Sequence, residues 1–142
     1  SRIMTPEVTP IFFLIAAVLN TVAGCLHLWI IYVGADGYRK FGAGEKMAQM
    51  AADGRKYPTF LTLGIASALF FFAAMCLSQT SLVPALPLAR EILWILTFVY
   101  LVRGTVPLVT YPWFRLFRKP FFVKSSIIVL GFALIHFLAL MS

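Results

Sequence analysis

The chain has 142 residues, of which 61% are hydrophobic and only 12% are charged. An average soluble domain is about 25% charged, and a soluble fold of this size leaves much of its surface in water. The composition therefore excludes a soluble globular enzyme, a disordered chain and a disulfide-rich secreted domain. The net charge of +7 does not predict nucleic-acid binding, because the basic residues lie between long apolar runs.

Four apolar runs are long enough to cross a membrane, at about 11–33, 58–78, 92–111 and 125–141. A spanning helix needs roughly 20 residues, with about 17 as the lower limit. A backbone in lipid must satisfy its own hydrogen bonds, so these runs are expected to be helices. The sequence predicts an all-α integral membrane protein, a four-transmembrane-helix bundle that forms one transmembrane domain over residues 1–142.

The connections between the runs fit this plan. The first, 34–57, is rich in glycine and contains 45–52, whose apolar residues recur at helical spacing and predict a short interfacial helix. The second, 79–91, contains two prolines, which break helices. The third, 112–124, interleaves aromatic and basic residues, a mixture that is favoured in the headgroup layer of a membrane.

The distribution of basic residues predicts the orientation. Connections 34–57 and 112–124 face the same side of a four-span protein, and together they hold nine of the twelve basic residues. The positive-inside rule places both of these connections in the cytoplasm and both termini on the other side. We expect a bacterial inner-membrane protein with periplasmic termini.

Residues 22–25, Val-Ala-Gly-Cys, resemble a lipoprotein cleavage box, in which Cys25 would be lipidated. The apolar run continues past this box to Val33, and the preceding segment has a single basic residue, Arg2. The favoured interpretation is a patch of small residues that lets two helices approach closely.

Arg103 lies inside the third apolar run, within Leu-Val-Arg-Gly-Thr-Val-Pro. A guanidinium at mid-span costs about 2.5–3.5 kcal/mol on insertion scales, and it does not deprotonate. One interpretation is that Gly104 and Pro107 end the helix early, so that Arg103 reaches the lipid phosphates at the boundary. The alternatives are an ion pair with an acid of the first cytoplasmic connection, namely Asp36, Glu45 or Asp53, or a site for an anionic ligand.

Other polar residues are predicted to join Arg103 in the cytoplasmic half of the bundle. Asn20 and His27 share a face of the first helix, and His27 lies about 9 Å from its cytoplasmic end by helix rise. Thr62 on the second helix and Tyr100, one turn before Arg103, complete the predicted ligand-binding residues: Asn20, His27, Thr62, Tyr100 and Arg103. The alternative is that these groups only hold the helices together by hydrogen bonds.

Three functions follow from this pocket. The favoured one is a lipid-binding or amphiphile-binding protein or accessory subunit; the alternatives are a small oligomeric transporter or channel and a membrane enzyme acting on a lipid or quinone. The expected partners are membrane lipids and either further copies of the chain or a larger membrane complex. No metal motif or cofactor motif is present in the sequence, and His136 is expected to be an interfacial residue or a bundle contact.

Overall fold

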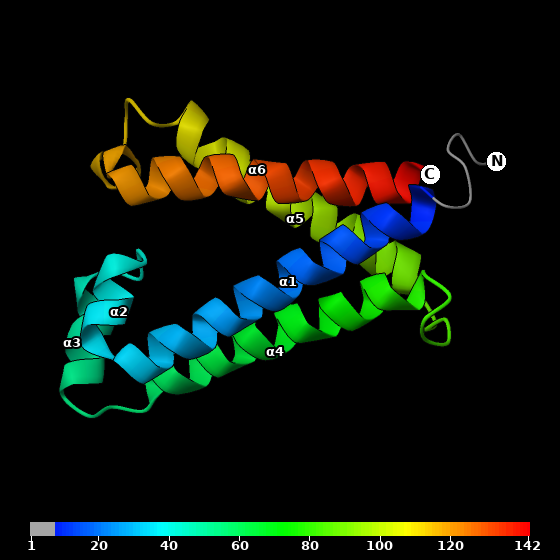
Figure 1. Ribbon diagram of the computed structural model, residues 1–142. Coiled ribbons are helices and arrows are strands. Elements are labelled where there is room, and N and C mark those ends of the chain that lie inside the picture. Colours follow the sequence, from blue (N-terminus) through cyan, green and yellow to red (C-terminus); the bar gives the residue numbers. More distant parts are fainter. Residues whose placement is uncertain (1–7) are drawn as a thin grey trace. The chain divides into compact units, whose positions relative to one another are not determined.

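The computed structural model describes residues 8–142, and in this range the chain is helical and contains no strand (Figure 1). Its elements are α1 (Val8–Val33), α2 (Ala35–Lys40), α3 (Glu45–Ala52), α4 (Tyr57–Ser78), α5 (Ala89–Val109), the 3₁₀ turn η1 (Arg115–Arg118) and α6 (Pro120–Met141). Helices α1, α4, α5 and α6 are each long and apolar enough to cross a membrane. The protein is therefore an all-α integral membrane protein, as predicted.

Most helix boundaries agree with the sequence, and the differences have local causes. Helix α6 begins at Pro120 rather than at 125, because proline fits the first turn of a helix, where its missing N–H is not needed. Helix α5 begins at Ala89, so Glu91 lies in its first turn. The positive end of the helix dipole stabilises the negative charge of Glu91 there. The short helix predicted at 45–52 is α3, whereas α2 and η1 were not predicted.

Helix α5 does not end at Gly104 or Pro107. It continues through both residues to Val109 and is capped at Thr110. The early helix end considered for Arg103 is therefore wrong. Pro107 only removes the N–H that would bond to the carbonyl of Arg103, four residues earlier, and the rest of the last turn keeps its helical form.

The chain divides into two compact units, and the prediction of a single domain over 1–142 stays a prediction. The first unit comprises the chain up to Leu19 together with Phe72–Ser142. Parts of all four long helices supply its apolar core: Phe13, Ala16 and Ala17 of α1, Met75 and Cys76 of α4, Ala89, Leu93 and Leu96 of α5, and Ala139 and Leu140 of α6. Burial of these side chains holds the first unit together.

The second unit, Asn20–Phe71, carries the short helices α2 and α3. Its core consists of Ile30, Tyr38 and Ala48, against which Met47 and Ala51 pack, so the apolar face predicted for 45–52 is turned inward. The Thr62 hydroxyl on α4 donates a hydrogen bond of 3.2 Å to the buried Tyr38 hydroxyl on α2. This bond ties the pair of short helices to a membrane-spanning helix.

Gly24 lies at a close approach between α1 and α4 within the second unit. A Cβ atom built at this position would be 2.9 Å from the Phe70 ring, which is closer than real contacts allow. This contact supports the packing interpretation at Gly24, whereas Val22 and Cys25 of the same stretch are exposed.

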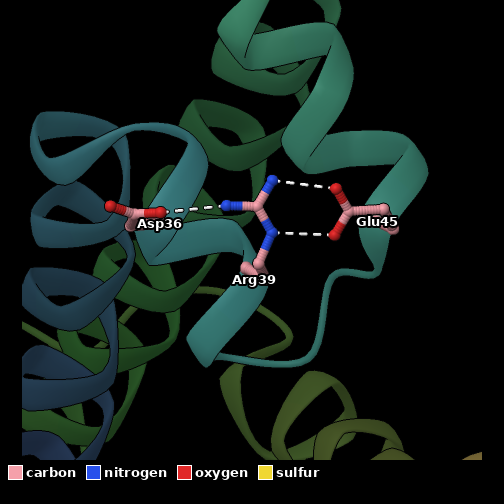
Figure 2. A network of polar contacts seen from close by, with 3 residues as sticks. All are labelled: Asp36, Arg39 and Glu45. Carbon is pink, nitrogen blue, oxygen red and sulfur yellow. Dashed lines mark hydrogen bonds and ion pairs between the residues drawn. The ribbon is translucent and has the colours of Figure 1, made fainter.

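An exposed ion-pair network joins α2 to the start of α3 (Figure 2). Arg39 donates to both carboxylate oxygens of Glu45, at 2.7 and 2.8 Å, and to Asp36 at 2.9 Å. Hydrogen bonding to Glu45, and then its charge, raise the pKa of Arg39. Because all three side chains are exposed to water, this network fixes the geometry of the α2–α3 connection more than it stabilises the fold.

Candidate functional site

Arg103 lies in the cytoplasmic half predicted for α5, six residues before the helix ends at Val109. This spacing corresponds to about 9 Å along the helix axis. Arg103 is half-buried. A permanent charge in this position needs polar contacts, and the contacts are found on α6.

Two adjacent serines of α6 hold the guanidinium. One terminal nitrogen of Arg103 donates to the Ser126 hydroxyl at 3.0 Å, and the other donates to the Ser125 hydroxyl at 2.8 Å. The central carbon of the guanidinium also lies 5.3 Å from the centre of the Phe122 ring, within the range of a cation–π contact. Hydrogen bonds to a charged group contribute about 1.5–3 kcal/mol each, which is comparable to the insertion cost of the arginine.

The serine hydroxyls are uncharged, so they do not neutralise the positive charge of Arg103. The guanidinium can therefore still bind an anion. A guanidinium has N–H groups on all three nitrogens, and the two hydroxyls use only one from each terminal nitrogen. The remaining N–H groups match the oxygens of a phosphate or a carboxylate. The side chain is fixed in place before any ligand arrives.

Helices α5 and α6 lie side by side and run in opposite directions (Figure 1). Arg90 at the start of α5 donates to the Leu140 carbonyl at the end of α6, and Arg103 reaches Ser125 and Ser126 near the start of α6. The helices approach closely at Gly104, where a Cβ atom would be 2.6 Å from the Leu130 side chain and 3.0 Å from the Ser126 carbonyl oxygen. The absence of a side chain at Gly104 thus sets the helix spacing beside Arg103.

Arg103 lines an open groove of about 450 Å³. Apart from the arginine, its lining is apolar: Phe98, Val99, Val102, Val106 and Pro107 of α5, Phe117 of η1, and Phe122 of α6. The groove thus pairs a single cation with a continuous apolar surface. This arrangement fits a ligand that has an anionic head and a hydrocarbon chain.

Tyr100 lies one turn before Arg103 and contacts α6 through its ring. The ring is edge-on to Phe132 and to His136, with centroid distances of 5.5 and 5.3 Å. His136 is 1% exposed, and its Nδ1 lies 2.7 Å from the Phe132 carbonyl oxygen. The expectation that His136 is a bundle contact is confirmed, and Tyr100 supports the helix pair that carries Arg103.

The other three predicted site residues belong to the second unit. Asn20 is fully buried, and Thr62 is occupied by its bond to Tyr38. The Nδ1–H of His27 donates to the Ala23 carbonyl of its own helix at 2.7 Å, which leaves Nε2 as the nitrogen that can bind another group. Tyr100 and Arg103 belong to the first unit, so the predicted pocket that joins all five residues stays a prediction.

The acids considered as partners for Arg103 have polar partners within their own unit. Asp36 and Glu45 pair with Arg39, and Asp53 accepts a hydrogen bond of 3.0 Å from Gln49. Sequence reasoning missed Ser125 and Ser126. The available signal was the short connection between the third and fourth runs, which brings the start of α6 alongside the end of α5.

No family model, curated protein or solved structure matches the chain. Among residues 8–142, no group of three or more histidine, cysteine, aspartate or glutamate side chains is placed to hold a metal ion. The site is therefore assigned from its geometry alone.

Proposed function

We propose that the protein binds an anionic lipid or a similar amphiphile in the groove between α5, η1 and α6. The observation that carries this proposal is the Arg103 guanidinium, which is held by Ser125 and Ser126 and lines an otherwise apolar groove. The anionic head would bind the guanidinium, and the hydrocarbon chain would lie along the α5 side of the groove.

The lining supports an amphiphile rather than a polar metabolite. A polar ligand would need several donors and acceptors to replace its lost water, and the groove offers only the guanidinium. The volume of about 450 Å³ is within the range of about 300–1,000 Å³ that is usual for small-molecule sites. Both a phosphate head and a carboxylate head match the guanidinium.

Within the first unit, Tyr100 would support the site through its ring contacts with Phe132 and His136. Asn20, His27 and Thr62 belong to the second unit, and their part in ligand binding stays a prediction.

The bias of basic residues supports a cytoplasmic location for the α2–α3 and α5–α6 connections, with both termini periplasmic, in a bacterial inner membrane. In this orientation the groove would open to the cytoplasmic leaflet. The spans also carry small residues that favour close helix contacts, which supports assembly with further copies or within a larger membrane complex.

Native mass spectrometry tests the proposal on the intact protein, released from nanodiscs that contain equal amounts of phosphatidylglycerol and phosphatidylcholine. We expect an adduct of one anionic lipid per chain that survives removal of bulk lipid, in excess over the zwitterionic adduct, because the choline ammonium of phosphatidylcholine offsets the phosphate charge and is repelled by the guanidinium. Equal retention of the two lipids would overturn the proposal.

The same spectra distinguish the alternative functions. A defined oligomer without a retained lipid would favour a small transporter or channel. A lipid or quinone that is bound and then chemically altered by the protein, with loss of turnover in His27→Ala, would favour a membrane enzyme. No contact among residues 8–142 selects either alternative over amphiphile binding.

A further inference from the structure

Residues 112–119, which connect α5 to α6, expose aromatic and basic side chains together. Trp113 is 74% exposed, Phe114 54% and Leu116 46%. The basic residues of the segment, Arg115, Arg118 and Lys119, are also exposed. We call residues 112–119 the connecting segment.

The connecting segment has a defined fold that holds these side chains outward. Its centre is the η1 turn, and Arg118 donates a hydrogen bond of 3.0 Å to the Pro112 carbonyl, which closes the loop. Phe117 is turned inward, with its ring 5.6 Å from Phe114 and 5.5 Å from Phe122 of α6. The exposed rings therefore lie on a surface that is fixed against α6.

The position and charge of the connecting segment identify what covers it. It joins the ends of two membrane-spanning helices, so it lies where the hydrocarbon core gives way to the headgroups. Tryptophan is favoured at this depth, and Lys and Arg side chains bind anionic headgroups there. Between Thr110 and Lys124 the sequence contains no acidic residue that would offset its cations.

We propose that the connecting segment binds the anionic phospholipids of the adjacent leaflet, through Arg115 and Lys119, and gathers them around Trp113. This proposal concerns lipid bound by the connecting segment, outside the groove. The two features meet at Phe117, which belongs to the connecting segment and also lines the groove. Gathered lipid would thus be delivered to Arg103, and in that one respect the inference rests on the proposed function.

Fluorescence quenching of Trp113 tests the proposal in vesicles. The parent protein carries Trp29→Phe and Trp94→Phe, so that Trp113 is the only emitter. The vesicles hold phosphatidylglycerol and phosphatidylcholine in equal amounts, with bromine on the acyl chains of one or the other. We expect the brominated anionic lipid to quench Trp113 at least about twofold more strongly, and concentrated salt to abolish the difference.

A charge variant and a matched control locate the effect. Arg115→Gln with Lys119→Gln is expected to make quenching by the two lipids equal. Lys40→Gln with Lys46→Gln removes the same charge from exposed positions on α2 and α3 and is expected to leave the preference for anionic lipid intact. Arg118 is left unchanged, because its bond to Pro112 closes the loop.

Equal quenching by the two lipids in the parent protein would overturn the proposal, and this result does not depend on the folding of any charge variant. A loss of preference in Lys40→Gln with Lys46→Gln would also overturn it, because the effect would then come from net charge alone. A retained preference at Trp113 without a lipid adduct in native mass spectra would refute the groove and leave the connecting segment as proposed.

Discussion

Replacing Gly104 by alanine is expected to destabilise the protein by about 1–3 kcal/mol, the usual cost of inserting a methyl group into a closed contact. The new Cβ atom would be 2.6 Å from the Leu130 side chain and 3.0 Å from the Ser126 carbonyl oxygen. Leu130 can change rotamer, but the Ser126 carbonyl is backbone, so α5 and α6 must separate. Because the Ser126 hydroxyl binds Arg103, lipid retention should fall as well.

Gly131→Ala is the matched control, because no atom lies within 4 Å of a Cβ built there on α6. Alanine is favoured over glycine in a helix by about 1 kcal/mol, so this variant should be neutral or more stable. Unfolding of both variants in detergent, followed by circular dichroism, measures the difference. If Gly104→Ala were as stable as Gly131→Ala, the close approach of α5 and α6 would be refuted.

Substituting Arg103 by glutamine is expected to lower the affinity for an anionic lipid about tenfold to a hundredfold, because the ligand loses a charge-assisted contact worth about 1.5–3 kcal/mol. Arg103→Lys should retain only part of the affinity, since an ammonium group lacks the planar fork. Arg103→Gln should not unfold the protein, because removal of a charge from a span relieves an insertion cost of about 2.5–3.5 kcal/mol. Native mass spectrometry measures retention, and thermal unfolding in detergent measures stability.

Arg90→Gln removes the same charge from the other end of α5. Arg90 donates to the Leu140 carbonyl in the last turn of α6, so its loss should reduce stability while lipid retention is unchanged. Arg103→Gln is therefore expected to lower lipid retention without lowering stability, whereas Arg90→Gln is expected to lower stability without changing lipid retention. Lipid retention that falls equally in both variants would mean that Arg103 acts only through the net charge of the protein.

The fold was predictable because hydropathy is a strong signal over twenty residues. The four spans and the short helix at 45–52 follow from run length and helical spacing, and the structure agrees with them. The helix boundaries were harder to predict, since a proline can break a helix or begin one. Pro120 begins α6, and Pro107 lies inside α5, so the identity of the residue alone did not decide the boundary.

The candidate site was predictable only in part. Arg103 was identified because a charge in a span is costly and therefore informative. Its partners Ser125 and Ser126 were not, because serine is common in membrane helices and gives no signal until the register of α5 against α6 is known. The groove was also hidden, since Phe98, Val102 and Phe117 look like any lipid-facing residues until η1 brings Phe117 beside α5.

Photolabelling shows whether a lipid occupies the groove, with phosphatidylglycerol or phosphatidylcholine that carries a photoreactive group in its acyl chain as the probe. We expect the anionic probe to label Val99, Val102 and Val106 of α5 several-fold more than Ile127 and Ile128, apolar residues of α6 that are more exposed. The zwitterionic probe should label both faces alike. The same labelling pattern from the two probes would contradict binding of an anionic head by Arg103.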